Sequence, residues 1–460
     1  MTDTSVIAGP IRADGSIPYE LGKPNWVVRT IPNIRSVSST VTIPANRLID
    51  VLILGDGFQN QAEFEDGLQS WIVAFYQLKV YDIFRGAFRI RALFRESQVR
   101  ASKNRGSFYA VKITEDDLGV VKGVSEEDIK FRRLVFEDVD SFPNINQRQY
   151  PKKDDEDRDL TFGESDNFSI GDWLFGMSRN LIVSMLVRTG KKTNASGETF
   201  RLKAPKEDRT VRVALGAFSI HEFSHAFGLL SDEYIEQRNS QSNRRNPERK
   251  NILNLLNLTF DDKYSQVPWF HLSPWGRDRR QASGQNPSPV VGWLWVGGDK
   301  HLGVWHSEYK CLMNGKHDNF KFTQDAAQDP TAQPDGTYND ETGENLRERR
   351  RFCLWCQELV TMRILERTDQ LDESDDPENF VEKGQRWYER WTTELRKNYW
   401  ELFDVSQQIV DHEAAYAALT PGRNKERLDG SDLYLAYRED APTRSGSSSF
   451  DDGEWLISLC

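Results

Sequence analysis

Cysteine and histidine are both scarce in this chain, with four cysteines and seven histidines among 460 residues. The cysteines come late, at Cys311, Cys353, Cys356 and Cys460. They are too few for the disulfide scaffold of a small secreted domain, and their number fits a reducing compartment. Long apolar runs are also missing. A run such as "NLIVSMLV" falls far short of the roughly 18 to 20 apolar residues that span a bilayer, so we expect no membrane span.

The amino-terminal segment lacks the features of a signal peptide. It reads "MTDTSVIAGPIRADGSIPYE", without the basic start and the apolar stretch that such peptides have. We therefore expect a cytoplasmic protein, or one that is exported by a dedicated machine that needs no cleavable signal.

A strong excess of one charge is missing as well. The net charge is −11, but 60 basic and 71 acidic residues contribute to it, which disfavours nucleic acid and anionic membranes as partners. Hydrophobic residues make up 38 % of the chain, with 13 Trp and 25 Phe, which indicates a folded chain with a large aromatic core. The partners we expect are protein or peptide substrates.

The order of apolar patterns predicts an α/β beginning. Residues 1 to about 40 are rich in Pro, Gly and Ser and predict an irregular arm on the body of the protein. The run "LIDVLILGDGF", from Leu48 to Phe58, predicts a buried strand that enters a turn. Helical spacing from Gln59 to about Phe84 predicts one long amphipathic helix, and "AFRIRALF" predicts a second strand.

Later segments continue this alternation and then become helical. "NLIVSMLVRTG" predicts another buried strand, and "VRVALGAFSI" leads directly into the motif described next. Residues 324–349 have almost no apolar content and predict a long loop. Beyond Phe352, "FCLWCQELVTMRILE" and "RWYERWTTELRKNYWELFDVSQQIV" have helical spacing.

The stretch "HEFSHAFGLLSDEY", from His221 to Tyr234, contains two of the seven histidines. On a helix His221 and His225 project about 40° apart, close enough for both imidazoles to reach one ion. The opposite side of the same helix is apolar and consists of Ile220, Phe223, Phe227 and Leu230. Packing against this apolar side can hold the helix rigidly while the two imidazoles stay available to a metal.

Glu222 lies about 100° round the helix from His221, too far to join the two histidines as a ligand. A carboxylate in that place suits a general base. Zinc with three protein ligands keeps a bound water whose pKa falls to about 7, and a neighbouring carboxylate can take its proton and pass it to a leaving amine. The predicted chemistry is hydrolysis of an amide.

The third ligand is the open part of the motif. Gly228 is predicted to end the helix in a left-handed conformation and to turn the chain back toward the metal. In metzincin-like motifs the third ligand follows at the position that Ser231 occupies here, and serine is a poor zinc ligand. The nearest carboxylates are Asp232 and Glu233.

The motif and four further segments resemble the IgA peptidase family of bacterial metallopeptidases. The zinc motif of that family resembles "HExGHSFGxLxDEY", and this chain departs from it at Ser224, where glycine is common. "VLILGDGF" resembles the family's early strand and "GDGY" turn, and "NLTFDD" followed by "PW" resembles its segment after the motif. "GVWHSEYKCLMNG" and "FCLWCQE" resemble its "GxYRPxxxCxM" stretch and "FCxVCxE" helix start. These matches extend over about residues 45 to 365.

The resemblance implies a role for several residues. His221 and His225 would be zinc ligands, Glu222 the general base and Asp232 the third ligand, with the adjacent Glu233 as the alternative. Met313, in "CLMNG", would form a methionine turn beneath the zinc, with a thioether that packs against the ligands without coordinating the ion.

The chain also departs from the family next to the predicted methionine turn. Trp305-His306-Ser307 stand where the family has Tyr-Arg-Pro. An arginine or tyrosine there could steady a tetrahedral oxyanion, and His306 or Tyr309 are the candidates to replace it. Because of this departure, cleavage of antibodies is not expected from the family's name alone. The family is mostly secreted, in contrast to the expectation from the amino terminus.

Cys353 and Cys356 form a Cys-x-x-Cys pair that has three interpretations. A second, structural zinc would need four ligands, for instance these two with Cys311 and Cys460. A thioredoxin-like redox pair would need to follow a strand in a βαβ pattern. The interpretation we favour is a structural pair near Cys311, either reduced or oxidised.

Together the sequence predicts an α/β (α+β) fold, a metzincin-like zincin with an appended helical region. Residues 1–40 would form the arm, 41–365 the zinc metallopeptidase domain with an upper subdomain to about 230 and a lower subdomain with the methionine turn after it, and 366–460 a helical carboxyl-terminal region and tail. The predicted function is a zinc-dependent endopeptidase with one catalytic Zn²⁺. The alternative is a catalytically silent zinc-binding module that acts as a structural or docking component. A regulatory or activating protein partner is also expected, because the arm or the 324–349 segment could cover the site until it is removed.

Overall fold

The computed structural model describes two sets of residues. The longer parts are 29–94, 180–188, 210–216, 220–233, 256–259, 267–273, 301–308, 311–313, 351–371 and 390–417. The shorter ones are 4–8, 19–21, 97, 100, 111–117, 130–136, 195–196, 198–203, 291–292 and 295–298. The predicted loop at 324–349, Tyr309 and Cys460 lie outside these residues.

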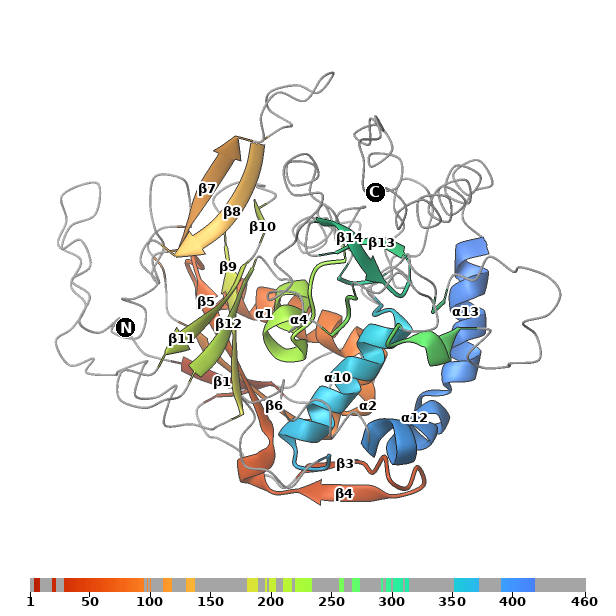
Figure 1. Ribbon diagram of the computed structural model, residues 1–460. Helices are drawn as coiled ribbons and strands as arrows, with labels where there is room; N and C mark the ends of the chain where they lie inside the picture. The colour runs from red at the N-terminus through yellow and green to blue at the C-terminus, as the bar shows by residue number, and fades with distance from the viewer. Residues whose placement is uncertain are drawn as a thin grey trace, which may run out of the picture.

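A seven-stranded sheet forms the centre of the fold (Figure 1). In spatial order its strands are β11 (Glu198–Lys203), β12 (Thr210–Gly216), β9 (Leu181–Val187), β5 (Ile49–Asp56), β6 (Phe88–Phe94), β1 (Thr4–Ala8) and β2 (Tyr19–Leu21). The four middle strands run parallel, and the strands outside them are antiparallel to their neighbours. The described residues combine helices with a sheet whose middle strands are parallel, which agrees with the predicted α/β class at this level.

The two innermost strands are buried at every residue. β5 and β9 have no exposed or half-exposed side chain, because a parallel strand in the middle of a sheet is covered on both faces. This burial explains why both sequences are continuous apolar runs. The strands predicted from "LIDVLILGDGF", "AFRIRALF" and "NLIVSMLVRTG" are all confirmed.

The amino-terminal arm was expected to be irregular, and this prediction is wrong for its described parts. β1 pairs with β6 and extends the central sheet, and β2 pairs with β1. β3 (Arg29–Pro32) and β4 (Thr40–Ile43) form a separate antiparallel ribbon. An edge strand of a sheet offers unpaired N–H and C=O groups, and a passing segment can pair with them whatever its own composition.

The single long helix expected from Gln59 to about Phe84 is divided in two. α1 (Gln61–Gln77) ends before Leu78, which has extended backbone angles, and α2 (Lys79–Ile83) follows. The break brings the ring of Tyr81 into a stack on that of Phe75, with centroids 4.1 Å apart. Helical spacing persists across the break, so the sequence pattern alone did not reveal it.

The motif helix α4 (Ile220–Gly228) packs between the central sheet and α10 (Leu354–Arg367) (Figure 1). Its apolar side is Phe223 and Phe227, both 0 % exposed. Aromatic rings from α1, α2 and β6 surround these two: Phe223 contacts Trp71, Phe75 and Tyr81, and Phe227 contacts Tyr81 and Phe88. The predicted apolar back of the helix is therefore confirmed, although Leu230 lies beyond the helix end.

The helix ends differently from the prediction. Gly228 is the last residue of α4, but the left-handed residue is Leu229, with φ 56°. Gly228 is needed for space instead, because a Cβ there would lie 3.2 Å from Val360 Cγ2 of α10 and 3.2 Å from Leu230 Cγ. A left-handed conformation at a leucine is strained by about 1 to 2 kcal/mol.

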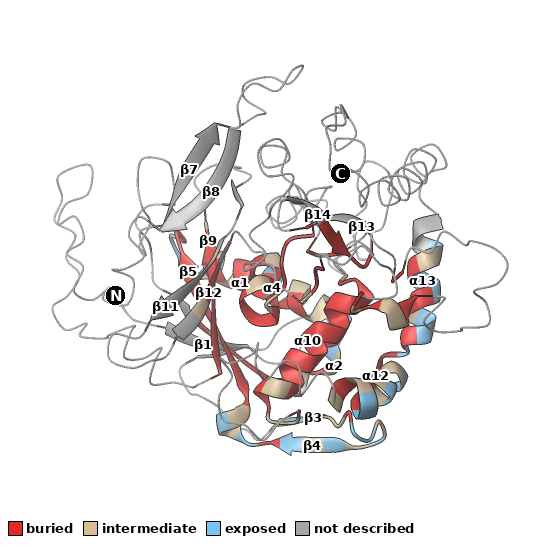
Figure 2. Cartoon of the chain, in the orientation of Figure 1, coloured by how far each residue is buried: buried red, intermediate tan, exposed pale blue. Residues whose placement is uncertain are grey.

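The carboxyl-terminal helices share the core with α10. A π-helical segment η7 (Trp391–Leu395) continues into α12 (Arg396–Phe403), and α13 (Val405–Ala417) follows after Asp404, which is left-handed. Helix was predicted here, but without this division. Figure 2 shows α10 buried along most of its length, whereas β4 is largely exposed. Trp391, Tyr399 and Phe403 are 0 % exposed and belong to the same hydrophobic cluster as the central sheet.

The remaining elements are short. β7 (Val111–Asp117), β8 (Lys130–Phe136) and β10 (Ala195–Ser196) form a three-stranded sheet, and β13 (Trp295–Gly298) pairs with β14 (His301–His306). Three 3-10 turns are η1 (Ala45–Arg47), η2 (Arg85–Ala87) and η5 (Phe270–Leu272). Thr259 forms an isolated bridge with Trp305, which joins residues 256–259 to β14.

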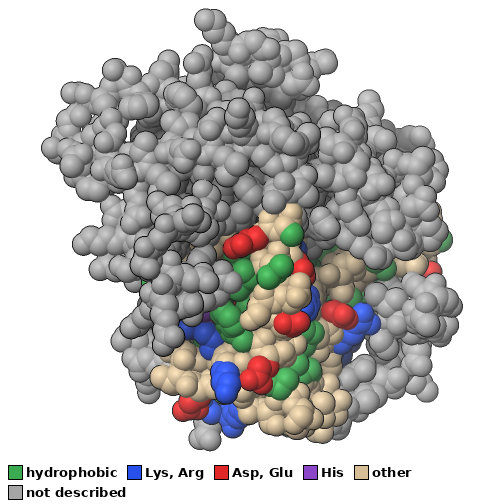
Figure 3. Space-filling model, turned by 90° about the vertical axis from the view of Figure 1, so that its right-hand side faces the viewer, with side chains coloured by type: hydrophobic (Ala, Val, Ile, Leu, Met, Phe, Trp, Pro, Cys, Tyr) green, Lys and Arg blue, Asp and Glu red, His purple; other side chains and the backbone are tan. Residues whose placement is uncertain are grey.

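The described surface carries charges of both signs. On the face shown in Figure 3, acidic, basic and apolar side chains are interspersed. Among the described helices, none combines the length and the apolar composition needed to cross a bilayer.

Candidate metal centre

The two motif histidines point to the same place. His221 and His225 come from successive turns of α4, and their Nε2 atoms lie 3.0 Å apart. The rings are nearly perpendicular, with centroids 4.6 Å apart. Each side chain is 18 % exposed, so both nitrogens lie near the surface of the described core.

Backbone carbonyls fix the orientation of both rings. The Nδ1 of His221 donates to the Leu312 carbonyl at 2.8 Å, and the Nδ1 of His225 donates to the Leu230 carbonyl at 2.7 Å. A neutral imidazole that carries its proton on Nδ1 has its lone pair on Nε2. The two lone pairs of neutral rings therefore face each other, which is the arrangement that a metal ligand needs from its surroundings.

Asp232 completes the group. Its Oδ1 lies 3.0 Å from His221 Nε2 and 3.2 Å from His225 Nε2. The carboxylate is 11 % exposed. Of the two carboxylates that the sequence left open, Asp232 is the one beside the histidines.

The position of Asp232 depends on Asn257, which sequence reasoning missed. Its Oδ1 accepts from the Ser231 N–H at 2.7 Å, and its Nδ2 donates to the Ser231 carbonyl at 2.9 Å. The same Nδ2 lies 3.1 Å from Glu233 Oε1. One buried amide therefore fixes the backbone of Ser231 and directs the next two side chains. Asn257 opens the "NLTFDD" segment, but no spacing rule connects it to the motif.

The donor set fits a zinc ion. Two imidazole nitrogens and one carboxylate oxygen lie within 3.2 Å of one another. Ligand bonds of about 2.0 to 2.2 Å in a tetrahedral site would separate such atoms by about 3.3 Å. If both imidazoles are neutral, the lone pairs of their Nε2 atoms, which lie 3.0 Å apart, repel each other. A cation bound between the two nitrogens removes that repulsion. Three protein ligands leave a fourth position for water or substrate.

Without a metal the same atoms form a hydrogen-bonded ion pair. Burial disfavours the charged form of His221, but the hydrogen bond to Asp232 and the charge of that carboxylate outweigh it and raise the pKa of His221 to about 9. Burial also opposes ionisation of Asp232, yet the charges and hydrogen bonds of the two histidines lower the pKa of Asp232. Metal binding would have to displace a proton from this group.

Glu222 follows His221 on α4 and is itself outside the group of His221, His225 and Asp232. The residue is 8 % exposed, and its charge contributes to the raised pKa of His221. Its carbonyl accepts from the Thr199 hydroxyl of β11 at 3.1 Å. This bond ties the first turn of α4 to the end strand of the sheet.

The segment predicted as a methionine turn lies against His221 and Glu233. Residues 311–313 supply the Leu312 carbonyl to His221, and the Met313 carbonyl accepts from the Glu233 N–H at 2.8 Å. Met313 is 0 % exposed. The role of the Leu312 carbonyl could not be predicted, because every residue has a backbone carbonyl and the sequence does not show which one will accept a hydrogen bond.

Of the two residues predicted to stabilise an oxyanion, the structure describes His306 but not Tyr309. His306 is the last residue of β14 and is 3 % exposed, and its role stays a prediction. Tyr309 lies outside the described residues.

Glu233 turns away from the histidines toward the cysteines. Glu233, Cys311, Cys353 and Cys356 form the second of two groups with metal-ligand spacing among the described residues. The three cysteines are buried and free. The expectation that the Cys353 and Cys356 pair lies near Cys311 is confirmed.

Comparisons with known proteins add no family assignment. A scan against protein-family models gives no match for this chain, and a search of curated proteins gives none either.

Proposed function

We propose that the chain is a zinc-dependent endopeptidase with a metzincin-like catalytic domain. The observation that carries this proposal is the convergence of two histidine nitrogens and an aspartate oxygen within 3.2 Å, with Glu222 next to them on the same helix. The α/β architecture is compatible with such a domain. The resemblance of the motif to that of the IgA peptidase family supports the same assignment.

A bound zinc ion would supply a water of lowered pKa and polarise the carbonyl of a substrate. His221, His225 and Asp232 would hold it. Glu222 would accept the proton of the attacking water and deliver it to the leaving amine, which is the task of a carboxylate that lies beside the ligands without joining them. The Leu312 and Leu230 carbonyls keep the protons of the two imidazoles on Nδ1.

The predicted substrates are proteins or peptides. Hydrolysis of an amide needs a general base and a proton donor for the amine, and one carboxylate can perform both tasks in sequence. Antibodies are not proposed as substrates, because the residues Trp305-His306-Ser307 differ from the family pattern shortly before the predicted methionine turn.

The test is Glu222→Gln in the full chain. Cleavage of an unfolded protein substrate is expected to fall by about 10²- to 10⁴-fold, the usual contribution of a general base. Zinc content, measured by elemental analysis, is expected to stay at the wild-type level because Glu222 is not one of the three ligand residues. Glu401→Gln, an exposed glutamate on α12, is the matched control and should keep full activity.

Two outcomes would contradict the proposal. If Glu222→Gln cleaves the substrate as fast as the wild type, the role of Glu222 is wrong. If the zinc-loaded wild type cleaves no protein, the alternative of a catalytically silent zinc-binding module with a structural or docking role gains support.

A further inference from the structure

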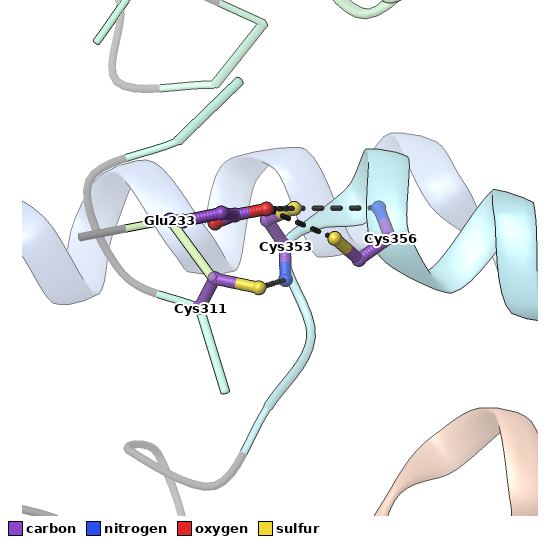
Figure 4. Close-up of side chains that lie close together, drawn as sticks. All are labelled: Glu233, Cys311, Cys353 and Cys356. Atoms are coloured by element: carbon purple, nitrogen blue, oxygen red, sulfur yellow. Dashed lines mark hydrogen bonds between the residues drawn. The ribbon is translucent and has the colours of Figure 1, made fainter. Parts of the chain in front are cut away.

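Three cysteines and one glutamate from three distant segments meet in the core (Figure 4). Their ligand atoms all lie within 4.8 Å of one another. Glu233 Oε1 is 3.0 Å from Cys356 Sγ and 3.7 Å from Cys353 Sγ. Figure 4 shows Glu233 and the three cysteines pointing toward one another.

The group is deeply buried, and one of its atoms has no partner. The four residues are between 0 and 4 % exposed. Among the described residues, no group hydrogen-bonds to Glu233 Oε2. A buried carboxylate oxygen without a partner costs free energy, and native structures usually satisfy it. Burial also raises the pKa of Glu233, Cys353 and Cys356.

Hydrogen-bond donors reach two of the three sulfur atoms, those of Cys311 and Cys353. The Cys353 N–H donates to Cys311 Sγ at 3.3 Å, and the Cys356 N–H donates to Cys353 Sγ at 3.3 Å. The Ser307 hydroxyl donates to the same Cys353 Sγ at 3.3 Å. Cys353 is also the N-cap of α10, where the helix dipole favours an anion. Such donors are typical of the groups that surround metal-bound thiolates.

We propose that Glu233, Cys311, Cys353 and Cys356 bind a second, structural zinc ion. Three thiolates and one carboxylate make a closed set of four ligands, as structural zinc sites have, with no position left for substrate. Sulfur-rich donors select zinc over magnesium or calcium. The ion would give the unpaired Glu233 oxygen and the three sulfur atoms a common partner.

A redox pair fits the same residues less well. Reactive thiols are partly exposed in electropositive surroundings, whereas these are buried with a carboxylate among them. A disulfide between Cys353 and Cys356 would also leave Glu233 with neither its Cys356 hydrogen bond nor a cation.

The proposed structural site is continuous with the histidine site. Asp232 and Glu233 are consecutive, and each faces a different group. Cys311 lies next to Leu312, which holds His221, and two residues before Met313, which accepts from Glu233 N–H. A structural zinc would therefore fix both segments that orient the histidine site.

The first experiment needs no substitution. Full-length protein, purified with a non-chelating reductant and dialysed with zinc, should contain about two zinc ions per chain, one for each set of ligands. X-ray absorption at the zinc edge should show a sulfur shell at about 2.3 Å beside nitrogen and oxygen at about 2.0 to 2.1 Å. One zinc per chain without a sulfur shell would overturn the proposal, and so would a Cys353–Cys356 disulfide found by mass spectrometry.

Paired variants then assign the ions. His221→Ala with His225→Ala should lose about half of the zinc and keep the sulfur shell, because the cysteine group is untouched. Cys353→Ser with Cys356→Ser should lose the sulfur shell. A sulfur shell that disappears with the histidines would contradict a separate site. Zinc content and the sulfur shell are measured without any cleavage assay, so the result for the structural zinc does not depend on peptidase activity. If the cysteine variant does not fold, the spectrum of the wild type still decides the proposal.

Discussion

Asn257 shows how much of the candidate site depends on one amide. It satisfies both backbone groups of Ser231 and contacts Glu233, although it is 26 residues away from Ser231. The backbone of Ser231 is held by these two hydrogen bonds, and the next residue, Asp232, reaches the histidines. Asn257 is thus a positioning residue for both groups.

We expect Asn257→Ala to weaken zinc binding at the histidine site by about 10- to 100-fold, the usual effect of removing a group that orients a ligand. The free energy of unfolding should also fall by about 1 to 3 kcal/mol, since buried backbone groups lose their partner. Zinc titration and denaturant unfolding measure the two effects. Asn398→Ala is the control: that side chain bonds an exposed carbonyl, and its loss should leave zinc affinity unchanged. Equal zinc affinity in Asn257→Ala and the wild type would show that the hydrogen bonds of Asn257 do not position Asp232.

The sequence predicted the residues of the histidine pair because a helix places neighbours by a fixed rotation. It could not decide between Asp232 and Glu233, because that choice depends on the turn after Leu229 and on contacts with Asn257 and Met313. Such contacts join segments that are far apart in the sequence. The cysteine group was predicted only in part for the same reason: the pair and Cys311 were expected together, but Glu233 was not expected among them.

At the scale of elements, α4 is held between an aromatic cluster and α10. Its apolar side meets rings from α1, α2 and β6, and Arg363 of α10 donates to the carbonyl of Phe227 at 3.3 Å. The helix end is thus fixed from two sides. This packing is what keeps the two imidazoles at a constant separation.

Phe223→Ala should cost about 3 to 5 kcal/mol of unfolding free energy and also weaken zinc binding at the histidine site, because the cavity loosens the helix that carries both imidazoles. Phe84→Ala is the matched control. Phe84 is equally buried, but among the described residues its ring contact is with Phe403 of α12, with centroids 5.9 Å apart, and not with α4. It should lose a comparable amount of stability and keep wild-type zinc affinity. Unfolding by denaturant and zinc titration separate the two cases, and equal affinity in both variants would contradict the role of the packing.

Strands with continuous apolar runs were the most predictable elements, since burial on both faces leaves a clear signal. Helix ends were less predictable. The break at Leu78 accompanies the stack of Tyr81 on Phe75, and the left-handed Leu229 follows Gly228, where a Cβ would lie 3.2 Å from Val360 of α10. Local propensity favours a continuous helix and a left-handed glycine at these two places.

At the scale of the whole molecule, two buried carboxylates, those of Glu358 and Glu308, join the carboxyl-terminal helices to the rest of the fold. Glu358 of α10 accepts from His271 Nε2 at 2.7 Å, Trp391 Nε1 at 2.6 Å and Arg396 Nε at 2.8 Å. Glu308 accepts from the Leu354 N–H at 2.6 Å and from His412 Nδ1 at 2.9 Å. Residues 390–412 therefore share buried contacts with the candidate catalytic region. The carboxyl-terminal helices are joined to that region more closely than the word "appended" suggests.

Acid should weaken this junction within a definite pH range. Burial opposes ionisation of Glu358, but His271 and Arg396 outweigh it and lower its pKa from 4.5 to about 2. A lowered folded-state pKa stabilises the fold above the unfolded value, and this contribution, on the order of 3 kcal/mol, is lost as the pH falls from about 4.5 to about 2.

Glu358→Gln should therefore be less stable than the wild type at pH 7 by about 3 to 5 kcal/mol, the usual cost of breaking a buried ion pair. The difference should shrink as the pH falls through this range, while acid effects on the metal sites are common to both proteins and cancel. Denaturant unfolding at a series of pH values measures it, with Glu401→Gln as the exposed control. A difference that is constant with pH would exclude titration of Glu358 as its cause.

The adjacency of Asp232 and Glu233 has a consequence for transplanting the motif. A designer who moves the fourteen residues from His221 to Tyr234 into another scaffold transfers both carboxylates, Asp232 and Glu233. The two histidines beside Asp232 are transferred with them, but the cysteines beside Glu233 are not. Without counterparts of Asn257, of residues 311–313 and of Cys353 and Cys356 at the start of α10, the new host lacks the contacts that direct Asp232 and Glu233 to different groups. The transferable unit is thus four separate pieces of chain, and a graft of the motif alone should bind zinc with mixed ligation.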